Sequence, residues 1–313
     1  MLLTLLLGLT APAVADDVIV FGDSWAAGSP PALQQALRAQ GFHDVFVDAQ
    51  GVGGTTAAYW ATEEPDALHE AVTANPDARW VWLSITGNDV FHHHANGRAA
   101  QSAADNEANL RTMFDDLFAV HPDIKVVMFG YDFVNFEQSI DCILTAFQIF
   151  GTDVTTRKVN EIFLAEVGAV QERVAADYPQ VTYIPDVWGT LQAAGEVPNA
   201  PNLDLPSPKR YFADCIHPTA EGYRKIHDVL VDAYWGDPSS AAWVDAAPPD
   251  TADTGAAPPD TDTPDTAAPD DPPLDGGIAA DSTCGCATPL APSPWILLVG
   301  LAGVFRRRQL PSR

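Results

Sequence analysis

Ser24 lies far from Asp214 and His217 in the sequence, and the three side chains together could perform nucleophilic catalysis. Ser24 follows an apolar run within Gly-Asp-Ser-Trp, where a strand turning into a helix would expose the hydroxyl. A serine hydroxyl is a weak nucleophile at neutral pH and needs a base within hydrogen-bond reach. His217 is suited to that role, because an imidazole changes charge near neutral pH. Asp214 lies three residues earlier and could accept the Nδ1–H bond, which would fix the imidazole tautomer.

Two further segments could donate hydrogen bonds to a negatively charged intermediate. Residues 51–56 read G-V-G-G-T-T, and residues 87–89 read G-N-D. We expect the side-chain amide of Asn88 and the backbone N–H of Gly54 to be the donors, each typically contributing about 3 kcal/mol in a transition state. Because Gly53 is adjacent, it stays open which of the two glycine amides donates.

Each of these residues also has an ordinary structural interpretation. Ser24 could be a helix N-cap, Asn88 a turn residue in a left-handed conformation, and His217 the residue before a helix start. Their joint occurrence favours the catalytic interpretation over the three separate ones.

A parallel sheet would bring these segments together. Between Asp16 and Asp245, short apolar runs alternate with longer helical patterns, which predicts βαβ units. The predicted strands cover 17–21, 44–47, 80–85, 125–130 and 181–184, and the predicted helices cover 31–40, 66–74, 102–119, 155–177 and 219–234. The fold class is therefore an α/β/α sandwich of three layers around a five-stranded parallel sheet. Right-handed crossovers place all carboxyl ends of the strands at one edge, where the reactive segments converge.

Four sequence blocks in this order resemble those of the SGNH hydrolases, the GDSL esterase and lipase superfamily. The blocks are F-G-D-S-W-A-A-G, G-V-G-G-T-T, G-N-D and D-C-I-H-P. The resemblance implies a flavodoxin-like fold and a serine esterase with no metal or organic cofactor. It implies Ser24 as nucleophile with Asp214 and His217 as the rest of the triad. It also implies Gly54 and Asn88 as oxyanion donors. Trp25 stands where the family usually has Leu, and the second block lacks its frequent Asn and acidic residue, but neither change removes a catalytic group.

Composition narrows the partners and substrates. The 313 residues are 47% hydrophobic, enough to bury a full core, so wholesale disorder is excluded. The 16 Lys and Arg against 42 Asp and Glu give a formal charge of -26, which repels nucleic acid. We expect a monomeric esterase acting on neutral substrates such as acetylated polysaccharides or short-chain esters, with lipid esters left open. The alternative from another class is a catalytically inactive surface module that binds glycan or protein.

Both ends of the chain carry patterns typical of export and tethering. Residues 1–15 form an apolar run ending in Ala-Val-Ala, which predicts a signal peptide and a catalytic domain over 16–245. Residues 246–283 are rich in Asp, Pro and Thr, which predicts a disordered stalk. Residues 284–313 contain Cys-Gly-Cys, a short apolar run and three arginines, and they resemble myxobacterial C-terminal sorting signals. That resemblance implies processing near the cysteines and retention at the cell surface, and a permanent membrane anchor is the alternative.

Two other features stay open at this point. Cys142 and Cys215 are the natural disulfide pair of an exported protein, with buried thiols as the alternative. His92, His93 and His94 suggest a metal, but three consecutive imidazoles cannot all face one ion, so we prefer a polar loop at the crevice rim.

Apolar residues near the predicted site allow more than one interpretation. Residues 133–151 could form a lid, a wall that binds an acyl group, or a helix packed on the sheet. Trp25, Tyr59 and Trp60 could form an apolar substrate wall or belong to the core.

Overall fold

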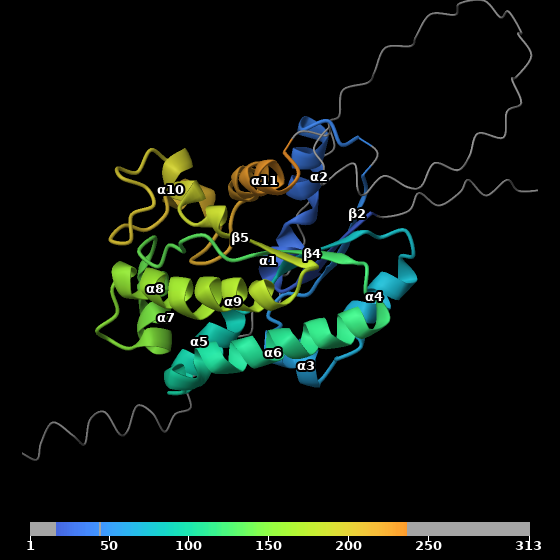
Figure 1. The fold of residues 1–313 in the computed structure, drawn as a ribbon. Coiled ribbons are helices and arrows are strands. Elements are labelled where there is room, and N and C mark those ends of the chain that lie inside the picture. Colours follow the sequence, from blue (N-terminus) through green and yellow to red (C-terminus); the bar gives the residue numbers. More distant parts are fainter. Residues whose placement is uncertain (1–16, 44, 237–313) are drawn as a thin grey trace, which may run out of the picture. The chain divides into compact units, whose positions relative to one another are not determined.

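A parallel sheet of five strands lies at the centre of the protein (Figure 1). The structure is a computed structural model and describes residues 17–43 and 45–236. The strands are β1 (Val18–Gly22), β2 (Val47–Gly51), β3 (Trp80–Ser84), β4 (Lys125–Phe129) and β5 (Val181–Ile184). Their order in the sheet is β2-β1-β3-β4-β5 and all pairs are parallel. The direction of winding therefore reverses between β1 and β3, which leaves a crevice at the carboxyl ends of these two strands.

Helices cover both faces of the sheet. One face packs against α2 (Pro30–Ala39) and α11 (Ala220–Tyr234), and the other against α3 (Ala57–Thr62), α4 (Ala67–Ala74), α6 (Ala99–Val120) and α9 (Ala169–Asp177) (Figure 1). The remaining helices are α1 (Ser24–Gly28), α5 (Gly87–Ala95), α7 (Ile140–Phe150), α8 (Thr156–Phe163) and α10 (Thr190–Ala194). Successive strand residues point to opposite faces, so Val20 and Trp82 join one apolar cluster while Phe21 and Leu83 join the other. Burial on both faces explains why β1 and β3 are almost wholly apolar.

The predicted α/β sandwich with five parallel strands is confirmed, with one strand displaced. β2 begins at Val47, the residue at which the predicted strand was to end. Its side chains are half-buried or exposed, because β2 lies at the edge of the sheet. Polar residues such as Asp48 and Gln50 are tolerated on an edge strand. Because of them, β2 lacks the run of apolar residues from which the strands were predicted.

The predicted loop around the three histidines is wrong, because they form the last turn of α5. His93 contacts the backbone oxygen of Asp89 at 2.7 Å and the Asp105 carboxylate at 2.8 Å. His94 contacts the Glu166 carboxylate at 3.0 Å. Within residues 17–43 and 45–236, no group of three or more His, Cys, Asp or Glu side chains could hold a metal ion.

Two apolar regions take a definite place in the structure. Residues 133–151 contain α7, whose main packing partner is α5, and its buried side chains join the same core cluster as residues of β3 and β4. Trp25 and Trp60 are buried in the two core clusters, which leaves neither as an exposed substrate wall.

The predicted helix over 155–177 is interrupted by a π-helical turn at Leu164–Gly168.

The predicted signal peptide (1–15), stalk (246–283) and C-terminal segment (284–313) lie outside the described residues. No helix in the described part of the chain has the length and apolar character needed to span a bilayer.

Candidate active site

Ser24 reaches the crevice through a turn that requires glycine at its first position. Gly22 has a φ of +131°, and a Cβ there would lie 1.9 Å from the backbone oxygen of Ser84 on the neighbouring strand β3. Asp23 then caps the next helix, since its Oδ1 accepts a 2.9 Å hydrogen bond from the N–H of Trp25. Ser24 is therefore the first residue of α1, directly after the carboxyl end of β1.

The structure brings Ser24, His217 and Asp214 into one hydrogen-bonded chain. The Nε2 atom of His217 lies 2.9 Å from the Ser24 Oγ, and the Nδ1 atom lies 2.7 Å from the Asp214 Oδ2. With Nδ1 donating to the carboxylate, Nε2 is the acceptor for the serine hydroxyl. This is the arrangement that general-base activation of a serine requires.

The Asp214 carboxylate is held in its ionised form. Its burial acts to raise the pKa, but hydrogen bonds from the His217 ring and from the backbone N–H groups of His217 and Ile216 outweigh it. Both N–H groups donate to Oδ1 at 2.8 Å. The resulting pKa of Asp214 is about 2, so at neutral pH the carboxylate stays charged and can stabilise an imidazolium.

The segment between Asp214 and His217 is fastened at three points. Cys215 forms a disulfide with Cys142 of α7, with a Cα–Cα distance of 5.4 Å, as predicted. The backbone oxygen of Cys215 accepts a 3.0 Å hydrogen bond from the N–H of Asn135. The indole of Trp25 donates to the oxygen of Ile216 at 3.1 Å. Trp25 follows Ser24 directly, so this last bond ties the turn of Ser24 to the loop that carries His217.

The predicted oxyanion donors lie on neighbouring segments of the same crevice. The Asn88 amide donates to the backbone oxygen of Thr55 at 2.9 Å, which links the second and third sequence blocks. An amide has a second N–H, which can serve an oxyanion. Gly54 has a φ of +82°, and Gly53 lies so close to the nucleophile that a Cβ there would be 3.8 Å from the Ser24 Cβ. Both glycines are exposed to solvent, and the role of Gly54 stays a prediction.

Tyr131 is a residue of this site that sequence reasoning missed. Its hydroxyl donates to the Asp23 carboxylate and accepts a 3.0 Å hydrogen bond from the N–H of Gly87. Gly87 opens α5 immediately before Asn88, so Tyr131 joins the turn that carries Ser24 to the turn that carries Asn88. Tyr131 follows β4 closely, and its place at the carboxyl end of a predicted strand was the available signal.

Comparison with known proteins identifies one family. The model of the GDSL-like lipase/acylhydrolase family matches residues 20–225. The search of curated protein sequences gave no match.

Solved structures with a similar fold include three hydrolases. LAE5, an alpha/beta hydrolase from the metagenome of Lake Arreo, Spain, is 16% identical with a TM-score of 0.46, covering 70% of this chain and 94% of its own. The acetyl xylan esterase AlAXEase is 18% identical with a TM-score of 0.44, covering 69% and 98%. A variant of the acetyl xylan esterase Axe2 from Geobacillus stearothermophilus is 16% identical with a TM-score of 0.46, covering 69% and 93%. At these identities the likeness is no guide to substrate.

Proposed function

Because this chain belongs to the GDSL-like lipase/acylhydrolase family and is a carboxylic ester hydrolase of the SGNH type, we propose that it works through an acyl-enzyme on Ser24. The observation that carries the proposal is the 2.9 Å contact between the His217 Nε2 and the Ser24 Oγ, with Asp214 on the opposite ring nitrogen. It supports His217 as the general base and Asp214 as the group that orients it.

The reaction then runs in two halves. The Ser24 oxygen attacks the ester carbonyl while its proton passes to the His217 Nε2, and the negative charge on the carbonyl oxygen is stabilised by Asn88 and the backbone N–H of Gly54. The C–O bond to the alcohol breaks as His217 returns the proton to the leaving oxygen. Water then attacks the acyl-enzyme by the same route, which releases the carboxylic acid and restores the Ser24 hydroxyl.

The nucleophile can be tested with the full chain and a small neutral ester, 4-nitrophenyl acetate. Ser24→Ala is expected to reduce turnover to near the background rate. The exposed His43 provides a matched control, since His43→Ala should leave turnover unchanged while His217→Ala removes it. Equal turnover by the wild type and Ser24→Ala would exclude Ser24 as the nucleophile.

A fluorophosphonate gives an independent readout of the same proposal. It should add one covalent group per chain, on the peptide that contains Ser24, and none to Ser24→Ala. The intact mass and the peptide map measure this directly.

For the substrate and the location we make a second proposal. The enzyme acts on neutral esters, from acetylated polysaccharides and short-chain esters to lipid esters, because the formal charge of -26 disfavours anionic substrates.

Its export and retention at the cell surface are supported by residues 1–15, 246–283 and 284–313. Fractionation of cells that make the full chain, compared with cells that make a variant without 284–313, tests the retention. Equal release into the medium would contradict it.

A further inference from the structure

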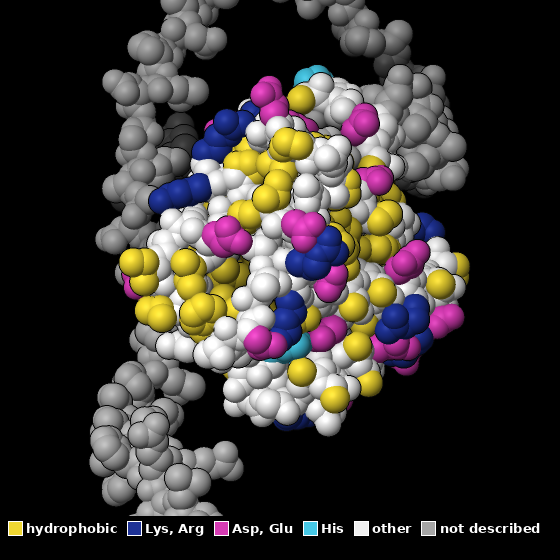
Figure 2. Space-filling view, turned by 90° about the vertical axis from the view of Figure 1, so that its left-hand side faces the viewer, with side chains coloured by type: hydrophobic (Ala, Val, Ile, Leu, Met, Phe, Trp, Pro, Cys, Tyr) yellow, Lys and Arg dark blue, Asp and Glu magenta, His cyan; other side chains and the backbone are white. Residues whose placement is uncertain are grey.

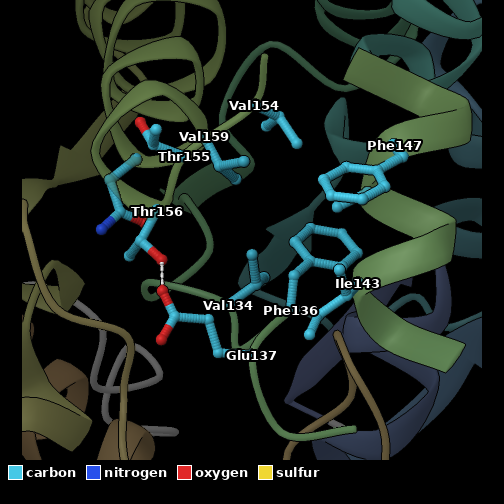
Figure 3. A pocket seen from close by; sticks show the side chains of 11 residues that line it. Val134, Phe136, Glu137, Ile143, Phe147, Val154, Thr155, Thr156 and Val159 are labelled. Atoms are coloured by element: carbon cyan, nitrogen blue, oxygen red, sulfur yellow. Dashed lines mark hydrogen bonds between the residues drawn. The ribbon is translucent and has the colours of Figure 1, made fainter. Parts of the chain in front are cut away.

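An apolar pocket lies between α7 and the start of α8, away from the hydrogen bonds of the triad. Its volume is about 210 Å³. The apolar side chains that line it are Val134, Phe136, Ile143, Ala146, Phe147, Val154 and Val159. The rings of Phe136 and Phe147 lie next to each other on one side of the space (Figure 3). An apolar cavity of about 150 Å³ is enough to hold benzene, so this pocket has room for a hydrocarbon segment.

The polar side chains of the lining are already hydrogen-bonded. Glu137 accepts from the hydroxyl of Thr156 (Figure 3). The Thr155 hydroxyl oxygen accepts from the N–H of Lys158 at 3.2 Å, and the Asn160 amide donates to the backbone oxygen of Leu203 at 3.0 Å. A sugar placed here would bury hydroxyl groups with few partners, which costs free energy. The lining therefore favours a hydrocarbon over a glycan.

Part of the lining is still open to solvent. Ile143 and Phe147 are each 37% exposed, although both contribute to the pocket wall. Hydrophobic side chains gather on the face of the molecule where α7 and α8 lie (Figure 2). A bound hydrocarbon would cover Ile143 and Phe147, and removing such apolar surface from water is favourable.

The pocket is attached to both halves of the candidate active site. Its wall residues Val134 and Phe136 flank Asn135, whose N–H bonds the oxygen of Cys215 at 3.0 Å. On the other wall, Ile143 follows Cys142, which is disulfide-bonded to Cys215 between Asp214 and His217.

A ring contact makes the second connection. Phe136 packs edge-on against Phe91 of α5, with 6.3 Å between the ring centroids. The first turn of α5 carries Asn88, so a ligand in the pocket rests on elements that position the base and the oxyanion donor.

The charges around the pocket select a neutral ligand. Glu137 belongs to the lining, and Asp141 is an exposed residue of the adjacent helix α7. The two cations beside the lining are already paired, Arg157 with Asp204 and Lys158 with Asp153. Together with the overall charge of -26, they disfavour an anionic head group. We propose that this pocket binds the hydrocarbon acyl chain of a neutral ester whose carbonyl lies at Ser24. The identity of the ligand as a substrate rests on the proposed function, and the pocket favours the lipid-like end of that substrate range.

The first test compares the full chain on 4-nitrophenyl acetate and 4-nitrophenyl octanoate. Each buried methylene strengthens binding about fourfold, so we expect kcat/KM for the octanoate to exceed that for the acetate by at least about tenfold. Ile143→Asp places a charge in the pocket wall and should lower this octanoate-to-acetate ratio about tenfold or more. Leu144→Asp is the matched control, because Leu144 is exposed on the same helix and does not line the pocket. An unchanged ratio in Ile143→Asp, or an equal fall in Leu144→Asp, would overturn the proposal.

The second test measures binding without turnover. Calorimetric titration of the Ser24→Ala chain with 1-octanol, a neutral hydrocarbon chain with no ester, should show one site with a negative heat-capacity change. Ile143→Asp in that background should weaken the site at least about tenfold, and Leu144→Asp should not. Absence of binding, or equal affinity in both variants, would overturn the proposal. Acetate turnover that survives Ser24→Ala would instead refute the proposed nucleophile and leave the octanol result standing, so the two failures are distinguishable.

Discussion

The hydroxyl of Tyr131 donates a hydrogen bond to the carboxylate of Asp23, and both side chains are almost fully buried. The same hydroxyl oxygen accepts the N–H of Gly87. One phenol therefore holds together the turn before Ser24 and the turn before Asn88, although it comes from neither sequence block.

Tyr131→Phe should lower both stability and turnover. The substitution leaves the Asp23 carboxyl and the Gly87 N–H without their buried partner, which typically costs about 1–3 kcal/mol. We expect kcat to fall more than KM rises, because the two turns that it connects act on the transition state. Urea unfolding and steady-state kinetics measure the two effects. Tyr178→Phe is the control, since the Tyr178 hydroxyl bonds Asp115 at the surface. If Tyr178→Phe lowers stability and turnover as much as Tyr131→Phe does, Tyr131 has no special role in the site.

The buried carboxyl of Asp23 should make stability depend on pH. Burial raises its pKa to about 7, although the hydrogen bonds from Tyr131 and from the N–H of Trp25 act to lower it. Between about pH 4 and pH 7 the folded chain thus keeps a proton that the unfolded chain has lost. The proton bound to Asp23 therefore stabilises the folded chain. This stabilisation is fully present below about pH 4 and is lost as the pH rises towards about 7.

Asp23→Asn carries no titrating group and tests that expectation. The stability of the variant relative to the wild type should increase between pH 4 and pH 8, with about 1.4 kcal/mol for each unit of pKa shift as the scale. Urea unfolding at several pH values measures it. A constant difference between the two proteins would show that the carboxyl does not titrate in this range.

Asp214→Asn should reduce kcat about 10³- to 10⁴-fold with little loss of structure, because an amide in this place no longer selects the tautomer that accepts the serine proton. The low pKa of Asp214, about 2, means that its carboxylate does not titrate between pH 8 and pH 5. The kcat of the variant is therefore compared with that of the wild type at pH 8, where the wild-type carboxylate is fully charged. Equal kcat values for Asp214→Asn and the wild type would show that the carboxylate does not act through His217.

Asn88→Ala should lower kcat about 10²- to 10³-fold, as is typical for removal of one oxyanion donor. The far end of the same helix offers the control. Asn96 is exposed and its amide bonds only the backbone oxygen of His92, so Asn96→Ala should have no effect on kcat. Equal rates for Asn88→Ala and the wild type would remove Asn88 from the reaction.

Loss of the disulfide between Cys142 and Cys215 should loosen the loop that carries Asp214 and His217. A bond closing a loop of this length typically contributes about 2–4 kcal/mol to stability. The double variant Cys142→Ser with Cys215→Ser should therefore unfold at lower urea and turn over more slowly. Reductant should produce the same change in the wild type and none in the double variant. Activity that resists both treatments would show that Asn135 and Trp25 hold the loop alone.

The sequence allowed the fold and the arrangement of the site to be predicted where a motif coincided with a strand end. Ser24 and Asn88 follow apolar strands, and the rule for parallel sheets places such residues together. Asp214 and His217 are close enough in sequence to form a pair by themselves.

Features that depend on long-range contacts were not predictable in the same way. The role of Tyr131 depends on partners from two distant turns, and no local pattern marks it. The helix α5 escaped notice because consecutive histidines show no helical periodicity, although each of His93 and His94 finds a carboxylate from another helix. The position predicted for β2 was wrong because β2 lies at the edge of the sheet, where its residues need not be apolar.

The close approach of Gly22 to the Ser84 oxygen also limits how this enzyme can be diversified. In a mutational library, position 22 should accept no other amino acid, because any side chain would push apart the two strands between which the crevice opens. The turn that follows β2 should tolerate far more substitutions, because its residue Val52 is exposed to solvent. Attempts to change substrate selectivity should therefore keep Gly22 and randomise the exposed turn around Val52.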